Sequence, residues 1–340
     1  MFSFPKNTCR GDWKVPFFSA KVPDDFSGKV RLDAFVASHP DGMNRSKLKS
    51  GVTEIMLNGA RAKLSAKVGA GDQIDIEWED NIPTDIIPQD IPLNIIYEDE
   101  DVTVVNKKQG MVTHPASGNW TGTLVNALLF HWGRDSIPQQ TDIAPAKMLE
   151  QRRPGIVHRL DKDTSGVIIT ARNRDAEEWL QAQFKDRRLG KIYIAIVTGK
   201  PPHARGEVKT QIIRDPKDRK RFKAVTGTES GKFAHTLYRL IASYGPYSLV
   251  ALKLKTGRTH QIRVHMKYLG CPILGDPLYG RKTTGTVFEG ATLMLHAFML
   301  KIRLPRQKKY TTFKADVPLR FKKVLRTLHQ SYPRIKPEVK

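Results

Sequence analysis

The pattern of hydrophobic and polar positions differs between the first quarter of the chain and the rest. Within residues 27–78, Leu32, Phe35 and Val36 have helical spacing, and residues 45–49 predict a second, basic helix. Asn58-Gly59 predicts a hairpin turn, and the alternation over 73–78 predicts a strand. Helical and strand signals within so short a stretch predict a small α/β domain.

From residue 93 onward the pattern predicts a larger body in which strands outnumber helices. Two strands are predicted within 93–107, and four more at GVIITAR, KIYIAIVTG, YSLVALKLKTG and TLMLHAFMLKIRL. Helices are predicted at TLVNALLFHW, AEEWLQAQFKDRRL and HQIRVHMKYLG. Because these strands rarely alternate one to one with helices, a doubly wound parallel sheet is disfavoured. We therefore predict an α+β fold whose mixed, mainly antiparallel β-sheet is flanked by helices.

Prolines and basic residues mark the predicted domain boundaries. Pro83, Pro88 and Pro92 deny the chain a regular helix and indicate a stiff, extended linker. The last forty residues hold thirteen Lys or Arg and only two acidic residues, which predicts a basic helix and tail outside the core. The predicted segments are an N-terminal extension (1–26), a small basic domain (27–78), a linker (79–92), a large domain (93–319) and a basic C-terminal helix and tail (320–340).

The charge balance narrows the class of partner. With 57 Lys and Arg against 34 Asp and Glu, the chain carries a formal charge of +23 and should bind a polyanion. No apolar run approaches membrane-spanning length and no lipidation or secretory signal is present, so we expect a nucleic acid rather than a membrane, and a cytoplasmic protein. Cys9 and Cys271, the two cysteines, lie far apart, which disfavours both a disulfide framework and a cysteine-based zinc site.

The stretch GIVHRLDKDTSG, residues 155–166, is a polar loop between two apolar segments, a common place for catalytic side chains. Arg159 and Asp161 are two residues apart, so an extended backbone would point both to one side. A carboxylate beside a guanidinium stays ionised, and in a water-poor pocket it can attack carbon. A surface loop whose Asp163 satisfies turn amides explains the same residues.

Two further stretches place polar side chains where a pocket could use them. Ile262, Met266 and Leu269 share a helical face, which leaves Arg263 off that face. Arg258 and His260 lie in the turn before this helix, where the helix N-terminus attracts an anion, although an ordinary solvated helix start explains them as well. Lys191 and Tyr193 share one face of a strand, and Tyr193 either contacts a base or packs its ring.

Other catalytic signatures fail. The segment 227–233 is one residue short of a phosphate-binding loop and lacks the Ser or Thr after Lys232. His260 and His265 are five apart and have no cysteine or carboxylate pairing, so we expect no metal and no cofactor. No Gly-x-Ser-x-Gly elbow is present, which disfavours a serine hydrolase.

Four segments in order resemble the RluA-type pseudouridine synthases, and in domain layout the large-ribosomal-subunit synthase D branch of that family. They are Asn106-Lys107 through His114-Pro115 with GTLVN, then GIVHRLDKDTSG, then Lys191-Ile192-Tyr193, and last GRTHQIRVH continuing to GDPLYG. Residues 27–78 resemble, less closely, the S4 RNA-binding domain that accompanies this branch. Two departures are a displaced glycine at Gly51 and Lys108-Gln109 where relatives commonly carry a proline.

The resemblance implies an activity and the residues that perform it. Uridine in structured RNA, most of all large-subunit ribosomal RNA, would be isomerised to pseudouridine after the base is flipped out of the RNA, without a cofactor. Asp161 would be the nucleophile, Tyr193 would stack on the flipped base or exchange a proton with it, and Arg263 would keep Asp161 ionised. Attack on the base and attack on the ribose both stay open.

RNA contacts are expected from the active site and from the small domain. The expected RNA-binding residues are His158, Arg159, Lys191, Arg258, His260, Arg45, Lys47 and Lys49. We expect the protein to act as a monomer on ribosomal RNA, with transfer RNA as a further candidate substrate. The alternatives are a catalytically silent RNA-binding or ribosome-assembly factor and a hydrolase of N-glycosidic bonds, for which the one nearby second acid is Asp163.

Overall fold

A computed structural model of the chain describes residues 17–42, 48, 52–78, 86–116, 118–135, 155–228, 230–280, 288 and 291–337. The chain divides into two compact units, Met1–Pro83 and Thr84–Lys340, and each is described by itself. Arg45, Lys47 and Lys49 lie outside the described residues, as does most of the helix predicted at 45–49.

In the small unit, as far as the structure describes it, a sheet packs against the short helix α1. The sheet order is β1-β6-β3-β4, formed by β1 (Phe17–Lys21), β3 (Val52–Leu57), β4 (Ala60–Arg61) and β6 (Gln73–Trp78), and β2 (Val30–Arg31) pairs with β5 (Lys67–Val68). The helix α1 (Leu32–Ser38) buries Leu32, Phe35 and Val36, as their spacing predicted. Asn58 and Gly59 both have positive φ, the conformation that a two-residue hairpin requires.

The start of the small unit differs from the predicted boundary at residue 27. Strand β1 lies within the predicted extension, yet it pairs antiparallel with β6 along its whole length, from Phe17 opposite Glu77 to Lys21 opposite Gln73. Phe18 is buried in the core of this unit. One buried aromatic residue in so short a strand is a weak sequence signal, which is why the pattern did not predict the strand.

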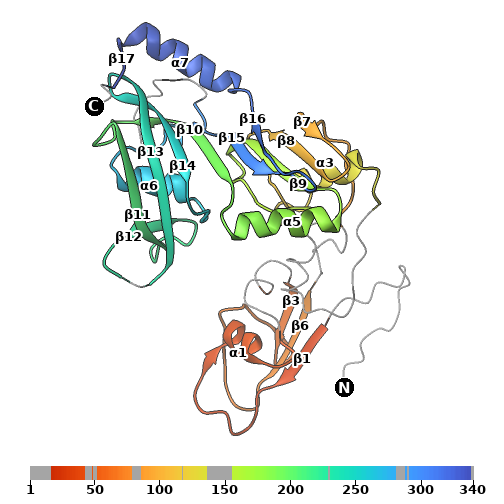
Figure 1. Cartoon of the computed structure of the whole chain (residues 1–340). Coiled ribbons are helices and arrows are strands. Elements are labelled where there is room, and N and C mark those ends of the chain that lie inside the picture. The colour runs from red at the N-terminus through yellow and green to blue at the C-terminus, as the bar shows by residue number, and fades with distance from the viewer. Residues whose placement is uncertain are drawn as a thin grey trace. The chain divides into compact units, whose positions relative to one another are not determined.

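The large unit is built on an 11-stranded sheet, counted over the described residues (Figure 1). Its main path is β12-β11-β13-β14-β10-β15-β9-β8-β7, with β16 paired to β15 and β17 to β13. The bounds are β7 (Ile95–Glu98), β8 (Val102–Lys107), β9 (Ser165–Ala171), β10 (Gly190–Thr198), β11 (Arg205–Arg214), β12 (Phe222–Val225), β13 (Lys232–Tyr244), β14 (Tyr247–Leu254), β15 (Leu295–Arg303), β16 (Tyr310–Lys314) and β17 (Arg334–Ile335). Every pairing is antiparallel except that of β15 with β9. The α+β class and the mixed, mainly antiparallel sheet are thus confirmed.

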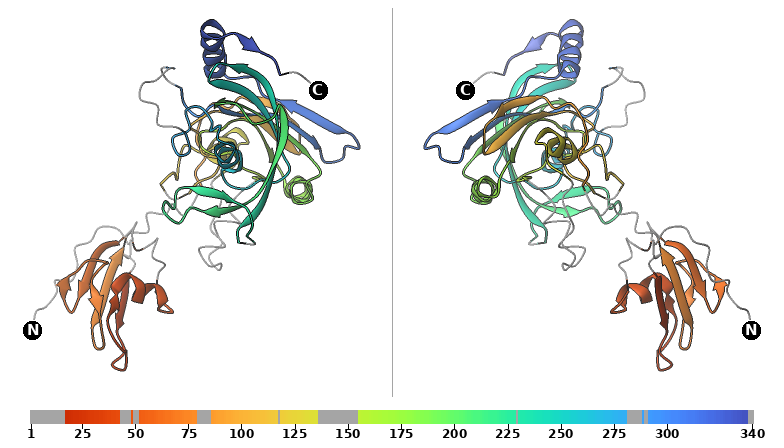
Figure 2. Two further views of the ribbon diagram at one scale, coloured as in Figure 1. Left: turned by 90° about the vertical axis from the view of Figure 1, so that its left-hand side faces the viewer. Right: turned by 90° about the vertical axis from the view of Figure 1, so that its right-hand side faces the viewer.

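Helices cover this sheet at the predicted places. In the described part of the unit they are α3 (Leu124–His131), α5 (Arg174–Lys185), α6 (Gln261–Tyr268) and α7 (Leu319–Ser331), with α7 at the top of the unit in Figures 1 and 2. Side chains of Thr123 and Asn173 cap the first two by accepting from Asn126 N and Ala176 N. These caps explain why both helices start where they do.

The C-terminal helix corrects one prediction. Phe321, Val324 and Leu328 of α7 are buried in the main hydrophobic core, so this helix is a core element as well as a basic one. Their spacing of three and four residues forms a single apolar stripe. The many Lys and Arg of the other face hid that stripe when composition was weighed over the whole segment. After α7 the chain returns to the sheet as β17, which pairs with β13.

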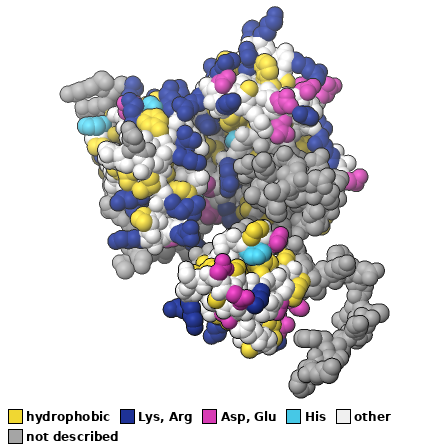
Figure 3. All heavy atoms as spheres, turned by 90° about the horizontal axis from the view of Figure 1, so that it is seen from below, with side chains coloured by type: hydrophobic (Ala, Val, Ile, Leu, Met, Phe, Trp, Pro, Cys, Tyr) yellow, Lys and Arg dark blue, Asp and Glu magenta, His cyan; other side chains and the backbone are white. Residues whose placement is uncertain are grey.

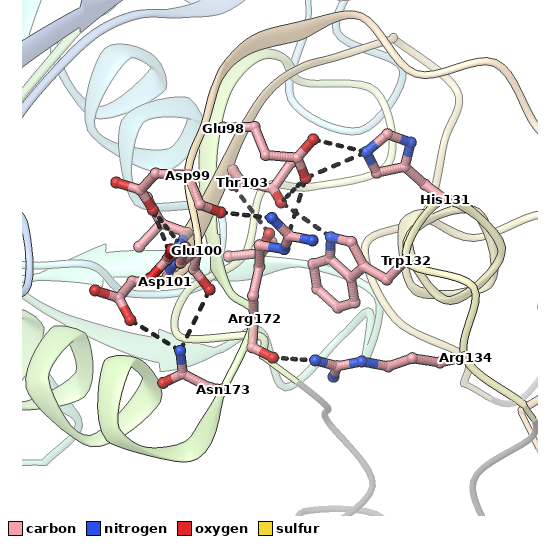
Figure 4. A network of polar contacts seen from close by, with 12 residues as sticks. Glu98, Asp99, Glu100, Asp101, Thr103, His131, Trp132, Arg134, Arg172 and Asn173 are labelled. Carbon is pink, nitrogen blue, oxygen red and sulfur yellow. Dashed lines mark hydrogen bonds and ion pairs between the residues drawn. The ribbon is translucent and has the colours of Figure 1, made fainter.

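A polar network fastens the turn between β7 and β8 to its neighbours (Figure 4). The Glu98 carboxylate accepts a hydrogen bond from Thr103 Oγ1 at 2.7 Å and lies 2.9 Å from His131 Nε2. Trp132 Nε1 donates to Thr103 Oγ1 at 3.0 Å, and Arg172 Nη1 donates to Asp99 O at 2.6 Å. Burial alone would raise the pKa of Glu98, but His131 and its other partners hold it below its ordinary value. The network therefore joins the ends of α3 and β9 to the acidic turn.

Candidate active site

The loop from Val157 to Thr164 carries the candidate nucleophile and is held at both ends. Ile156 forms a bridge with Thr170 before the loop, and β9 begins at Ser165 after it. Thr164 N donates to Asp161 O at 3.0 Å, which closes a turn directly before the strand. The Asp161 side chain keeps 22% of its surface exposed, so its carboxylate is reachable from solvent.

A buried lysine anchors this loop from behind. Lys107 Nζ donates to Lys108 O, Met111 O and Lys162 O at 3.0, 2.7 and 3.2 Å. Burial lowers the Lys107 pKa to about 7, and the negative charge of Asp161 opposes that shift. The three carbonyl groups satisfy all three ammonium protons. Lys107 therefore fixes the backbone next to Asp161.

Arg263 faces Asp161 from helix α6. Its Nη1 lies 3.5 Å from Asp161 Oδ2, while Nε and Nη2 donate to the two carboxylate oxygens of Asp276 at 2.8 Å each. Both Arg263 and Asp276 are buried. Burial alone would raise the pKa of Asp276, but Arg263 holds it below its ordinary value. A bidentate pair of this kind fixes the guanidinium plane, so that one nitrogen stays directed at Asp161.

His260 approaches Asp161 from the turn before α6. It has a left-handed backbone, with φ at 55°, and its Nε2 lies 3.8 Å from Asp161 Oδ2. The Tyr279 hydroxyl accepts from Phe222 N and lies 2.9 Å from His260 Nδ1. That hydroxyl can donate its own proton to Nδ1, which leaves the ring proton on Nε2. Burial lowers the pKa of His260, which favours the neutral ring beside Asp161.

Gln261 explains why the turn and helix take this shape. Its Oε1 accepts from Thr256 Oγ1 at 2.7 Å and from Arg258 N at 2.9 Å. Its Nε2 donates to His235 O at 3.1 Å and to Thr236 Oγ1 at 2.9 Å. This buried side chain thus ties the start of α6 to β13 and sets the positions of His260 and Arg263.

Tyr193 lies on β10, between β14 and β15, and lines the same cavity as Asp161. Its ring is buried, and among the described residues its hydroxyl has no hydrogen-bond partner. Burial, and after it the charge of Asp161, raises the Tyr193 pKa far above its ordinary value. The tyrosine therefore keeps its proton at physiological pH and can offer a ring face and a neutral hydroxyl to a substrate.

The cavity around these side chains has a volume of about 1120 Å³. Asp161 is its one acidic lining residue in the described part of the chain, against ten Lys and Arg: Arg159, Lys185, Arg187, Arg188, Lys191, Lys253, Lys255, Arg258, Arg263 and Lys301. Such a lining attracts an anionic substrate and still leaves one nucleophilic carboxylate. Among the described residues no three His, Cys, Asp or Glu side chains gather as metal ligands would.

The other predicted RNA-binding residues of this unit also line the cavity, in different settings. Arg159 is exposed. Lys191 lies over the Phe184 ring at 5.5 Å, and burial lowers its pKa. Arg258 Nε donates to Phe233 O at 3.0 Å. His158 differs, because its Nε2 accepts from Ile169 N and its ring stacks on Phe184, which engages the side chain with the scaffold.

Sequence reasoning did not assign roles to Lys107, Asp276, Tyr279 or Gln261. All four lie within the segments that resemble the family, but the sequence alone did not indicate their individual roles. A signal was available for Asp276, since an acidic residue in a mostly apolar turn must find a cationic partner once buried. Nothing local in the sequence identifies that partner as Arg263.

Comparison with known proteins agrees with this fold. Residues 101–268 match the family described as RNA pseudouridylate synthase. The chain is 43% identical to the ribosomal large subunit pseudouridine synthase D of Borreliella burgdorferi over 320 residues, covering 92% of this chain and 94% of that protein. It is 38% identical to the protein of the same name from Neisseria meningitidis, covering 87% and 78%. Human RNA pseudouridylate synthase domain containing 1 has a similar structure, with a TM-score of 0.55 and 26% identity over 74% of this chain and 92% of that one.

The chain belongs to the RNA pseudouridine synthases, within the RluA family. It is therefore an isomerase that acts on RNA. Membership agrees with the resemblance found in the sequence, and no finding favours a catalytically silent factor. The described helices include none that is long and apolar enough to cross a membrane.

Proposed function

We propose that this enzyme converts uridine to pseudouridine in large-subunit ribosomal RNA, with Asp161 as the nucleophile. The observation that carries the proposal is a reachable carboxylate in a cavity whose other charged lining residues, in the described part of the chain, are all Lys or Arg. The guanidinium of Arg263 lies 3.5 Å from it, and the ring of Tyr193 lines the same cavity. The names of the Borreliella and Neisseria relatives support ribosomal RNA as the substrate.

The reaction balances without an external reagent. The bond between N1 and C1′ of the uridine breaks, the base turns, and C5 bonds to C1′ in its place. The proton lost from C5 is matched by one gained at N1. Asp161 would hold one fragment covalently while the base turns, and Arg263 would stabilise the carboxylate before attack and after release. Tyr193 would stack on the base and offer its neutral hydroxyl, since its pKa is raised by burial.

RNA binding must offset the cost of flipping a base out of its stack, which is on the order of a few kcal/mol. In our proposal Arg159 holds the extruded nucleotide, and Lys191, Arg258 and His260 contact the RNA around it. The small unit, whose residues 27–78 we propose as an S4-like RNA-binding domain, adds phosphate contacts through Arg45, Lys47 and Lys49. The affinity should fall steeply with rising salt, because each phosphate contact releases counterions. We place the enzyme in the cytoplasm as a monomer.

The experiment is to incubate the purified enzyme with unmodified transcripts of large-subunit ribosomal RNA, small-subunit ribosomal RNA and transfer RNA. Pseudouridines are then mapped by base-specific chemical labelling. The proposal expects defined positions in the large-subunit transcript alone. Modification confined to transfer RNA or to the small-subunit transcript would overturn the assignment of substrate.

A further inference from the structure

One edge of the cavity is formed by an exposed tyrosine among cations, which we term the Tyr310 rim. It consists of Lys185, Arg187 and Arg188, from the end of α5 and the turn after it, with Lys301 of β15 and Tyr310 of β16. All five side chains line the same cavity as Asp161. In Figure 3 Lys and Arg side chains gather on facing sides of a hollow in the large unit. The rim is therefore continuous with the active site.

Strand register places the rim beside the active-site strand. Lys301 pairs with Gly190, the first residue of β10, and Arg303 of the same strand pairs with Tyr310. Tyr193 is three residues further along β10, which is roughly 10 Å at strand spacing. An RNA strand that delivers its uridine to Tyr193 therefore reaches the rim within a few nucleotides.

Tyr310 presents an exposed aromatic ring. Its side chain is 49% exposed, and among the described residues its hydroxyl makes no hydrogen bond. Lys301 Nζ lies over the Tyr310 ring, 5.7 Å from its centroid, so a cation covers one face and a base would stack on the opposite face. An aromatic face with adjoining cations is the arrangement on which single-stranded nucleic acids stack their bases.

The turn at Arg187 supports a ligand at this rim. Arg188 N donates to Gln183 O, which closes α5 with a Schellman turn, and Arg187 occupies its left-handed position with φ at 57°. Glycine is the usual residue there, because a side chain is strained in that conformation. Arg187 therefore adds a positive charge to the edge of the cavity at the cost of backbone strain. A glycine would avoid that strain but would add no charge.

We propose that Tyr310 stacks on an unpaired base of the RNA strand flanking the target uridine, while Lys301, Lys185 and Arg187 contact the phosphates of that strand. The inference rests on the proposed function, and it adds a second base-binding position outside the cavity floor. The rim selects for single-stranded RNA beside the target, because a paired base keeps its faces stacked on its neighbours.

The test compares binding by Tyr310→Ala, Tyr310→Phe and Tyr268→Ala, all in an Asp161→Asn background so that turnover does not affect the measurement. Tyr268 is the matched control, since it is 51% exposed and does not line the cavity. The probe is a short stem-loop of large-subunit ribosomal RNA containing the mapped uridine. Tyr310→Ala should raise the Kd by about tenfold, as expected for one lost stacking contact. Tyr310→Phe and Tyr268→Ala should stay within about twofold of the parent, given that the ring face, and not the hydroxyl, is used.

A second set of probes identifies the stacked base. Stem-loops carrying a single abasic site at each position flanking the uridine are titrated with the parent and with Tyr310→Ala. At one position the abasic probe should bind both proteins equally, because the stacking partner is missing. An unchanged Kd for Tyr310→Ala on the intact probe, or an effect that persists at every abasic position, would overturn the inference. Failure of the proposed function is separate, because it is measured by product mapping with the active enzyme.

Discussion

Arg263 and Asp276 form a buried bidentate pair, with two nitrogen–oxygen distances of 2.8 Å, and the remaining guanidinium nitrogen of Arg263 lies 3.5 Å from Asp161. Asp276 thus determines where the positive charge beside the nucleophile sits. Its carboxylate also accepts from Leu278 N and Tyr279 N, which fixes the turn that supplies Tyr279 to His260. One aspartate therefore positions both groups that face Asp161.

Replacing Asp276 by asparagine should damage the active site and the fold together. The change leaves the buried guanidinium of Arg263 without its counter-charge, a loss that typically costs about 3 to 5 kcal/mol. We expect a lower free energy of unfolding in urea and a kcat reduced by at least about tenfold, with RNA affinity retained. Asp175→Asn, at an exposed position in the first turn of α5, is the matched control and should keep the wild-type kcat and lower the free energy of unfolding by at most about 1 kcal/mol. A variant with the wild-type kcat would contradict the role given to Asp276.

Truncating Phe321 should destabilise the large unit, because this residue of α7 is fully buried. Loss of a phenylalanine side chain from a core costs about 3 to 5 kcal/mol. Leu319→Ala, on the same helix and 73% exposed, should cost well under 1 kcal/mol. Chemical unfolding of both variants measures the difference. Equal free energies of unfolding for the two variants would contradict the placement of α7 in the core.

Acid should weaken the fold through two buried histidines. Burial lowers the pKa of His265 and of His296 to about 4, below the ordinary value of 6.5. Their contribution is therefore complete above pH 6.5 and is lost as the pH falls toward 4, by about 2 kcal/mol for each ring at pH 5. Unfolding in urea at pH 7, 6 and 5 measures this slope.

A substitution of His296 distinguishes the effect of its ring on stability from the effect of carboxylates that titrate in the same pH range. The Ser165 hydroxyl lies 2.9 Å from His296 Nδ1 and can donate to it, so His296→Asn keeps an acceptor for Ser165 while removing the titrating ring. Between pH 7 and pH 5 the free energy of unfolding of this variant should fall by about 2 kcal/mol less than that of the wild type, because one titrating ring is missing. A slope identical to the wild-type slope would show that the ring does not contribute to the pH dependence.

Much of the fold follows from local patterns. The spacing of apolar residues located α3, α5 and α6, and apolar runs located several strands of the large unit. The pattern failed for β11 and β13, where buried polar residues such as Thr210 and Thr236 interrupt the apolar periodicity. Both hydroxyls bond to His265, a partner supplied by α6 that strand periodicity does not reveal. Hydrogen bonds to His265 thus satisfy the two hydroxyls that these strands bury.

Part of the candidate site could likewise be predicted from local sequence, and part depends on the fold. Asp161 and Arg263 stood out as a loop carboxylate and as an arginine displaced from its helix's apolar face. Their closeness depends on a fold that joins residues 102 positions apart. His158 is among the expected RNA-binding residues, and its Nε2 accepts from Ile169 N while its ring stacks on Phe184. Side-chain direction within an irregular loop is set by packing, which sequence spacing alone does not encode.

The central claim, that Asp161 is the nucleophile, is tested by comparing Asp161→Asn with Asp163→Asn on the same ribosomal RNA transcript. Both substitutions remove one negative charge from the same loop. Pseudouridine formation and the Kd for the transcript are measured for each variant and for the wild type. We expect Asp161→Asn to bind RNA normally and form no pseudouridine, while Asp163→Asn forms it at the wild-type positions. Pseudouridine at the same positions with Asp161→Asn would contradict the account.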